Sequence, residues 1–353
     1  AGEGVVNLEK YGSFHFRHVE FIEEKRGFMD LNKFYTPEGV ETVRIENLAI
    51  GDSHAKKADH RLLRSLVDQV IKVFNPKNIT LDDLFDGESI SAYEKGKAIT
   101  MAKKAEAGQL DLKHELDITL DYVKGLLAVT SPDTVIHIKC SNHNDWLIRY
   151  LENPQNAIDA QNQRIIHELS LAMLDGKNPM AAYFEKNLST KFHNRLVFWE
   201  AEDSFWVGPE NKEPGKPDRM VLLSEHGDHG ANGAKGSFLT FLKAAKNVIF
   251  GHTHTYRRYN RTVNFPTMSE NPAPYSKAGF SNWSQGVAIV GPNGEIQVLI
   301  YRNGEWYRQE DRQLQSPVKF FEPGYPYVKP NNESSATQID QYSSGRGRSR
   351  GRR

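Results

Sequence analysis

Residues 43–74 read VRIENLAIGDSHAKKADHRLLRSLVDQVIKVF and place a β-rich run, a polar cluster and a helical pattern in direct succession. The apolar and β-branched run at 43–50 ends at the cluster GDSH, residues 51–54. Apolar residues then recur at helical spacing between 62 and 74, which predicts an amphipathic helix. Asp59 precedes that helix, where a carboxylate can cap the first turn. This stretch therefore predicts a strand, a polar loop and a helix.

The same succession recurs along the chain. We expect further strands near 78–81, 134–140, 196–199, 219–223 and 247–250. Helices are expected over 90–129, from the third strand to about 191, and from near Lys235. Two later runs, 286–290 and 296–301, flank Pro292-Asn293-Gly294 and indicate a hairpin.

The length of 353 residues is about twice the ~100–200 residues of a usual domain, so one large domain and two smaller ones are both open. We expect an N-terminal extension of unassigned role at 1–42 and a main domain at 43–329, with 90–129 as a helical insertion. The insertion could serve dimerisation or gating, although its periodic apolar residues first indicate core. A polar Ser, Gly and Arg composition predicts a disordered tail at 330–353.

The charge of the chain is unevenly distributed. Lys plus Arg, 45, equals Asp plus Glu, 45, but five arginines lie in the last eight residues, so the rest carries 40 minus 45, or −5. Such a tail could add sequence-independent affinity for nucleic acid, or only aid solubility. The single cysteine, Cys140, excludes an intramolecular disulfide framework. No run approaches the ~20 apolar residues of a membrane span, so we expect a cytoplasmic protein without membrane contact, processed or a fragment because it lacks an initiator Met.

Five polar clusters each follow a predicted strand. In layered α/β architectures the carboxyl ends of strands line one crevice, so residues distant in sequence can meet there. Imidazole, carboxylate and amide groups suit Mn, Fe or Zn. One such cluster alone could be a surface turn or a hydrogen-bonded core histidine, but five at strand ends favour a metal site. The clusters are Asp52 with His54, Asp83 with Asp86, Asn142 with His143, His226 with Asp228 and His229, and His252 with His254.

In this order the clusters resemble the motifs of the calcineurin-like metallophosphoesterase superfamily, D-x-H, G-D-x-x-D, G-N-H-[DE], a lone His and G-H-x-H, nearest in character to its nucleases. The resemblance covers about residues 43–300. Asp82 replaces the glycine of the second motif, and Ser141 with Asn144 alters the third, while each ligand position is kept. The resemblance implies an α+β fold, a four-layer α/β/β/α sandwich with two mixed sheets.

The resemblance also implies two divalent metal ions, Mn ahead of Fe, Zn or Mg, about 3.5 to 4 Å apart. Both would act on one bridging water and on the phosphoryl oxygens. Asp83 would bridge the two ions, because a shared carboxylate offsets their repulsion. The first set of ligands would be Asp52, His54 and His254, and the second Asn142, His226 and His252.

The resemblance assigns His143 as the general acid that protonates the leaving oxygen. Asp86 would be its partner, and a buried carboxylate beside His143 would raise the pKa of the imidazole. In the fourth motif we prefer His226 to His229 as ligand, because His226 directly follows an apolar strand.

Basic residues beside the motifs bear on the substrate. Lys56, Arg257, Arg258 and His229 are candidate substrate contacts, and tyrosines interleave with the later arginines, which suits phosphate contact with base stacking. Solvated loop charge is the alternative. We therefore expect a metal-dependent nuclease with nucleic acid as partner, DNA ahead of RNA. A phosphoprotein or small-molecule phosphatase and a non-catalytic phosphate- or nucleic-acid-binding scaffold are the alternatives, and a homo-oligomer stays open.

Overall fold

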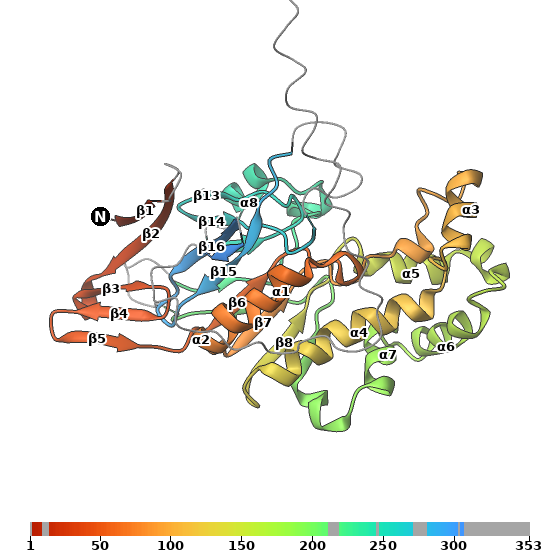
Figure 1. The fold of residues 1–353 in the computed structure, drawn as a ribbon, viewed down its shortest axis with the longest axis horizontal. Helices are drawn as coiled ribbons and strands as arrows, with labels where there is room; N and C mark the ends of the chain where they lie inside the picture. The colour runs from red at the N-terminus through yellow and green to blue at the C-terminus, as the bar shows by residue number, and fades with distance from the viewer. Residues whose placement is uncertain are drawn as a thin grey trace, which may run out of the picture. The chain divides into compact units, whose positions relative to one another are not determined.

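The computed structural model describes residues 2–8, 14–210, 219–244, 247–270, 281–302 and 304–306. The chain divides into two units, Ala1–Val318 and Lys319–Arg353, and all described residues belong to the first. The tail expected at 330–353 and the end of the main domain therefore lie outside the described residues. Helices and mixed sheets confirm the α+β class (Figure 1).

The larger sheet has a parallel and an antiparallel half. Within the described residues its strand order is β17-β16-β15-β6-β7-β8-β9. Strands β6 to β9 run parallel, and β15 to β17 pair antiparallel with β6 and with one another. These strands fall where the sequence predicted them, apart from the short β17. They are β6 (Asn47–Ile50), β7 (Asn78–Leu81), β8 (Val135–Ile138), β9 (Leu196–Phe198), β15 (Gln285–Val290), β16 (Ile296–Arg302) and β17 (Glu305–Trp306).

A second sheet has the order β10-β11-β12-β14-β13 within the described residues. Its inner strands run parallel, and both edge strands pair antiparallel. Strands β11 and β12 were expected. The other three were not, because these runs of two to four residues are too short to show a period and none of the five polar clusters follows them. The strands are β10 (Trp206–Val207), β11 (Val221–Leu222), β12 (Asn247–Phe250), β13 (Arg257–Tyr259) and β14 (Arg261–Asn264).

The two sheets pack face to face through one apolar cluster. Alternation along a strand sends Ala49 of β6 into this interface. Phe265 and Ile249 meet it from the second sheet, and Ala288 and Val298 from β15 and β16. All five are buried, so the interface between the sheets is apolar core.

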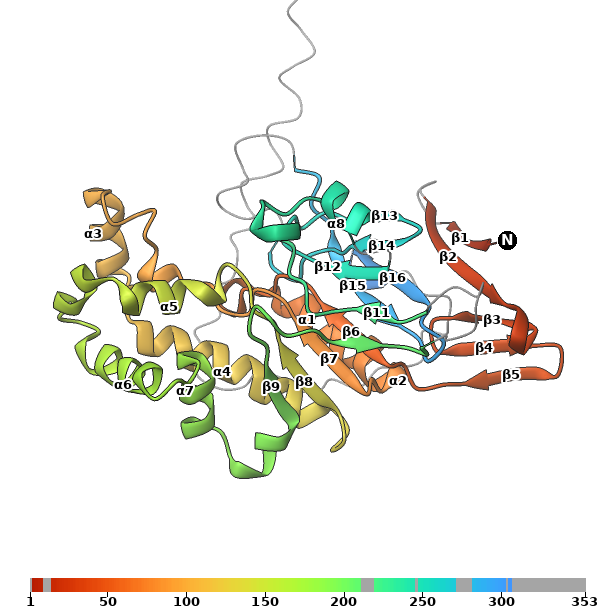
Figure 2. The same ribbon diagram turned by 180° about the vertical axis from the view of Figure 1, so that it is seen from behind.

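Helices cover the outer faces. Helix α8 (Phe238–Ala244) packs on the second sheet, where the Phe241 and Phe250 rings stack 4.2 Å apart. On the larger sheet, Leu48 is paired with Ile79 on the face opposite Ala49, and both are fully buried. Helices α1 and α4 run along this part of the sheet in both views (Figures 1 and 2). They span His60–Leu66 and Leu112–Val129.

The expected cap of α1 and the apolar core side of the 90–129 region are confirmed. However, that region forms two helices, α3 (Ala98–Glu106) and α4, instead of one, and α8 begins at Phe238. Asp59 caps α1 by accepting from the amides of Arg61 and Leu62, at 2.9 and 3.1 Å. The region 90–129 supplies α4, whose apolar side is core, and helices continue to residue 195. The other helical segments of the main domain are η2 (Ala55–Lys57), η3 (Val67–Ile71), α2 (Lys72–Phe74), η4 (Glu88–Ile90), α5 (Asn144–Glu152), η5 (Pro154–Ile158), α6 (Gln163–Leu174), α7 (Pro179–Asn187), η6 (Thr190–Arg195) and η7 (Ala231–Gly233).

The N-terminal extension is an antiparallel sheet in strand order, which the sequence did not predict. It contacts the larger sheet through Gln297 of β16. The Gln297 Oε1 accepts from the Leu31 amide at 2.5 Å, and its Nε2 donates to the Met29 carbonyl at 2.9 Å. The strands are β1 (Gly2–Leu8), β2 (Phe14–Ile22), β3 (Gly27–Asp30), β4 (Lys33–Thr36) and β5 (Gly39–Thr42), with η1 (Glu23–Lys25) after β2.

None of the described helices has both the length and the apolar character needed to cross a lipid bilayer.

Glu295 lies just before β16 with 1% of its surface exposed, and neither carboxylate oxygen has a hydrogen-bond partner among the described residues. Burial raises the pKa of Glu295 to about 7. Because the pKa of Glu295 is higher in the folded than in the unfolded protein, the protonated carboxyl contributes to folding stability. The whole contribution is present when the pH is below the unfolded-state pKa. This contribution is lost as pH rises through the folded pKa.

We expect Glu295→Gln to remove this loss. Between pH 5 and pH 8, the unfolding free energy of the wild type should fall by up to about 3 kcal/mol more than that of the variant. Thermal unfolding at both pH values measures the difference, with the exposed Glu305→Gln as a control that follows the wild type. Identical pH dependence in wild type and Glu295→Gln would contradict the assignment.

Candidate metal centre

The polar clusters meet because the strands before them end level. Ile50, Leu81 and Ile138 are paired across β6, β7 and β8, so the loops that follow leave the sheet side by side. The second sheet joins them through the loop after β12, which contacts the loop after β6 and also the loop after β11. The His252 amide donates to Asp52 Oδ1 at 3.2 Å, and the Gly251 amide donates to the His226 carbonyl at 2.8 Å. The clusters after β6, β7, β8, β11 and β12 therefore form one site, as expected.

Four site residues have left-handed backbones that non-glycine residues rarely adopt. Their φ angles are 40° at His54, 35° at Asp83, 67° at His252 and 58° at His254. Such conformations cost about 1–3 kcal/mol each and cluster at functional sites. Loop-to-loop hydrogen bonds help to hold them, since the His54 amide donates to the Asp83 carbonyl at 2.8 Å. The fold thus maintains strained backbone at the expected ligand positions.

The second expected ligand set is assembled. His226 Nε2 lies 2.9 Å from Asn142 Oδ1 and 3.3 Å from Asp83 Oδ2, and His252 Nδ1 lies 3.1 Å from the same Asn142 oxygen. Ligand atoms of Asp83, His226 and His252 all lie within 4.8 Å of one another. Donor atoms of the four residues converge, so this arrangement can hold a metal ion. His226, not His229, supplies the imidazole here.

The structure brings the first expected ligand set, Asp52, His54 and His254, only partly together. Asp52 Oδ2 lies 3.0 Å from His254 Nε2, and both side chains are buried. The His54 ring centroid lies 5.7 Å from that of His254. However, the compact group that contains His54 is completed by Asp86 and His143, at mutual ligand-atom distances within 4.8 Å. His54 thus borders both groups.

The buried charges of the site balance one another. Burial would raise the pKa of Asp52, but His254 and His226 outweigh it and lower the value to about 2. For Asp83, His226 and His143 overcome the same effect and hold the pKa well below its usual range. Burial lowers the pKa of His226, but Asp83, with Asp82 and Asp52, raises it well above its usual value. Carboxylates are therefore held ionised, and His226 holds a proton that a metal ion would displace.

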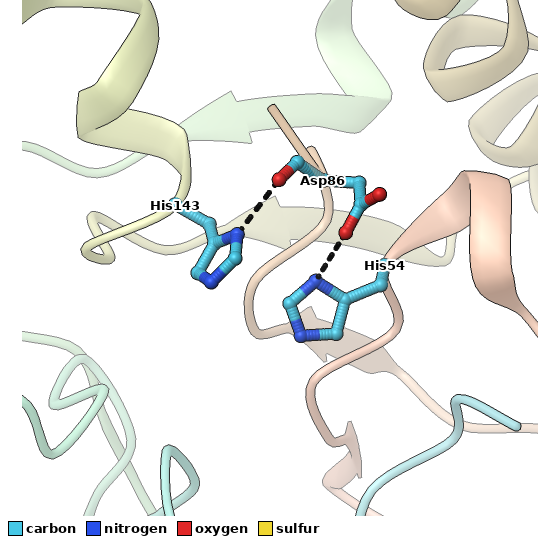
Figure 3. A group of neighbouring side chains, drawn as sticks. All are labelled: His54, Asp86 and His143. Carbon is cyan, nitrogen blue, oxygen red and sulfur yellow. Dashed lines mark hydrogen bonds and ion pairs between the residues drawn. The ribbon is translucent and has the colours of Figure 1, made fainter. Parts of the chain in front are cut away.

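The expected pairing of the Asp86 carboxylate with His143 is wrong (Figure 3). Asp86 Oδ1 instead lies 3.3 Å from His54 Nδ1, and Asp86 Oδ2 lies 2.8 Å from Lys57 Nζ. His143 Nδ1 lies 2.8 Å from the Asp86 backbone carbonyl. Because a carbonyl only accepts, His143 Nδ1 carries a hydrogen and leaves Nε2 for proton exchange.

The expected rise in the pKa of His143 is likewise wrong. Burial lowers this pKa, and the nearby His54 opposes the raising effect of Asp83. The physical reason is that burial outweighs the raising effect of Asp83 and Asp86 on this pKa. The Asp86 carboxylate contacts His54 and Lys57, so the hydrogen bond of His143 is to the Asp86 carbonyl. The His143 ring instead stacks on Trp146 with centroids 4.0 Å apart.

The expected substrate contacts separate into two kinds. Lys56 Nζ pairs with Glu88 at 2.8 Å, and Arg258 donates to the carbonyls of Ile296 and Asn260, which ties both to the fold. Arg257 is exposed in the edge strand β13. The His229 side chain is 62% exposed and pairs with Asp228. Only Arg257 and His229 remain accessible among these four.

Four further side chains around the site were not predicted as site residues. Asp82 was noted only as a replaced glycine, and Lys139 lies at the end of a predicted strand with no motif to mark it. Trp146 follows His143 at helical spacing, and Trp283 contacts His254 with ring centroids 4.1 Å apart. The i,i+3 spacing of Trp146 from His143 is the one signal that could have found it.

We expect divalent metal binding to release protons, because an imidazole must lose its proton to coordinate. At pH 7, metal binding should release at least about one proton per chain, mainly from His226. Titration calorimetry in two buffers of different ionisation enthalpy measures the number. His226→Ala should reduce it, and the exposed His114→Ala should not. Equal heats in both buffers would contradict the charge balance described above.

Comparison with known proteins gives one informative result. No protein-family model matches the chain, and no solved structure matches it. The chain is similar to Protein A1 of Escherichia phage T5, with 25% identity over 322 residues, which cover 87% of this chain and 55% of that protein. The chain thus spans about half the length of this relative.

Proposed function

We propose that the protein is a binuclear metallophosphoesterase, a metal-dependent phosphodiesterase that acts as a DNA nuclease. The observation that carries the proposal is the place of Asp83. One of its oxygens lies 3.3 Å from His226 Nε2, and the other accepts from the His143 amide at 3.2 Å, so this buried carboxylate lies between the second ligand set and His143. The packing of two mixed sheets with outer helices supports the metallophosphoesterase sandwich.

The residues would divide the chemistry among them. Two divalent ions, Mn²⁺ first, would supply an activated water and would clamp the phosphoryl oxygens. Asn142, His226 and His252 would hold one ion. The first set, Asp52, His54 and His254, would hold the other, and Asp83 would bridge. This division uses every buried histidine of the five clusters as a ligand.

His143 remains free of that ligand role and would protonate the leaving oxygen. Its Nδ1 hydrogen bond to the Asp86 carbonyl fixes the ring, and the Trp146 ring supports one face. Nε2 can then carry the transferred proton. Since burial lowers the pKa of His143, the acid form would be depleted as pH rises towards neutrality.

Aromatic side chains favour a nucleic-acid strand over a small monoester. The rings of Trp146 and Tyr93 are neighbours, with centroids 5.7 Å apart, and Tyr93 is 75% exposed. Trp283 borders the site at His254. Stacking of a base on an aromatic ring contributes about 1–3 kcal/mol. Tyr93, Trp146 and Trp283 would thus position the nucleotides that flank the cleaved bond, with RNA as the second candidate.

The proposal is tested by hydrolysis of DNA, RNA, bis-p-nitrophenyl phosphate and p-nitrophenyl phosphate with Mn, Mg or Zn. We expect cleavage of DNA and of the diester that a chelator abolishes. His143→Ala should lower DNA cleavage about 10²–10⁴-fold, but should affect the diester less, because nitrophenolate leaves without a proton. Asp68→Ala, in an exposed ion pair with Lys72, is the control. Activity on the monoester alone would indicate a phosphatase and overturn the nuclease proposal.

Tyr93 offers a separate test of strand binding. We expect Tyr93→Ala to weaken single-stranded DNA binding about tenfold while bis-p-nitrophenyl phosphate hydrolysis is unchanged, because loss of one stacked base removes ~1–3 kcal/mol. Tyr259→Ala is the matched control, since Tyr259 is 58% exposed but lines a cavity with Arg219 and Arg261. DNA affinities measured by fluorescence anisotropy decide. A loss with Tyr259→Ala and none with Tyr93→Ala would place the strand elsewhere.

A further inference from the structure

We infer that Asp82 and Lys139 form a positioning pair for His226, in which Lys139 fixes the Asp82 carboxylate and Asp82 orients the imidazole towards the second metal position. The inference rests on the proposed function, because it concerns the same metal centre. Neither residue belongs to the ligand sets described above. Both are buried, and Asp82 occupies the position at which the resembling motif has glycine.

The two nitrogens of His226 face different partners. Nε2 faces Asn142 and Asp83, at 2.9 and 3.3 Å, which is the ligand side. Nδ1 has no hydrogen-bond partner among the described residues, and the carboxylates that it faces are those of Asp52 at 3.7 Å and Asp82 at 3.9 Å. Asp52 is needed as a ligand of the first set. Asp82 is therefore the carboxylate left to orient Nδ1. Its Oδ2 lies slightly farther from Nδ1 than Asp52 Oδ1 does, and beyond hydrogen-bond distance, so it orients the ring by charge and accepts the Nδ1 hydrogen when the ring shifts.

A carboxylate beside the second nitrogen of a coordinating histidine has a known physical effect. A histidine that coordinates through one nitrogen commonly donates its other N–H to a carboxylate. That contact fixes the ring orientation and makes the imidazole a stronger donor to the metal. Loss of such a partner typically costs 10- to 100-fold in metal affinity. Asp82 would do this for His226.

Lys139 supplies the opposite charge that a buried Asp82 requires. The Lys139 Nζ lies 2.9 Å from Asp82 Oδ1 and donates to the Glu225 carbonyl at 3.1 Å. The aliphatic part of the lysine is buried with it, and Nζ lies 5.6 Å from the centroid of the Phe265 ring. An unpaired buried carboxylate would be strongly destabilising. An ammonium has no acceptor atom, so Lys139 neutralises Asp82 without competing for metal.

Gly251 packs directly against the Asp82 carboxylate. A Cβ at position 251 would lie 2.7 Å from Asp82 Oδ2 and 3.0 Å from Asp52 Oδ1. Both distances are shorter than an ordinary van der Waals contact. The backbone at 251 therefore approaches two buried carboxylates so closely that a side chain there would displace at least the Asp82 carboxylate.

The first ligand set has a parallel arrangement. Asp86 Oδ1 lies 3.3 Å from His54 Nδ1, and Lys57 contacts both Asp86 oxygens, at 3.1 and 2.8 Å. Each set thus contains one imidazole backed by a buried carboxylate and a lysine. The lysines differ, because the Lys57 side chain is 30% exposed and that of Lys139 is 1% exposed.

The test measures Mn²⁺ binding, by calorimetry and by electron paramagnetic resonance of the spin-coupled pair of ions. The decisive variant is Asp82→Leu with Lys139→Met, which removes both charges together and keeps similar volumes, so the fold should persist. We expect two Mn²⁺ sites in the wild type. In the variant, affinity at one site should fall 10- to 100-fold and the coupled signal should need correspondingly more Mn²⁺, while the other site is retained. Asp68→Leu with Lys72→Met, an exposed pair, is the matched control and should bind like the wild type.

The outcomes separate the two proposals. If the variant binds both ions as tightly as the wild type, the pair is only structural and the inference is overturned while the proposed function stands. If the wild type binds no metal, the proposed function itself fails. Asp82→Asn keeps the side-chain size and an oxygen for Lys139, and gives the same comparison if the double variant does not fold.

Discussion

Buried carboxylates beside imidazoles, at one edge of two packed sheets, are the constraint on which the site depends. Asp52, Asp82, Asp83 and Asp86 all lie buried within the loops that leave β6 and β7. A buried carboxylate without positive charge at short range would destabilise the fold. Histidines from the second sheet and two lysines provide this charge. The two sheets are thus joined at this edge by charge and, further inside, by apolar core.

The sequence predicted the strands that end at the polar clusters. Strands β7 and β12 have the predicted bounds because polar clusters mark where each apolar run stops. The sheet at 2–42 was not predicted, since its aromatic residues follow no clear alternation. Strand β13, with three residues, was missed because it is short and no polar cluster follows it. Pattern recognition therefore succeeded where a strand ends at one of the polar clusters or belongs to the hairpin at 286–301.

Side-chain partnerships within the site were less predictable than its membership. The second ligand set meets as its motif order predicts, but Asp86 turns to His54 and Lys57 instead of His143. The orientation of the Asp86 side chain depends on its rotamer and on a lysine from another loop. Neither can be predicted from the spacing of residues in the sequence. Lys139 could not be found for a similar reason, because a single lysine in a strand carries no pattern until its carboxylate partner is located.

The central claim is that Asp83 bridges two metal ions. Crystals of the protein grown with Mn²⁺ and measured at the manganese absorption edge would locate every bound ion directly by anomalous scattering. The account predicts two peaks about 3.5 to 4 Å apart, with an Asp83 carboxylate oxygen contacting both. A single peak held by His54, Asp86 and His143, or no peak beside Asp83, would contradict it.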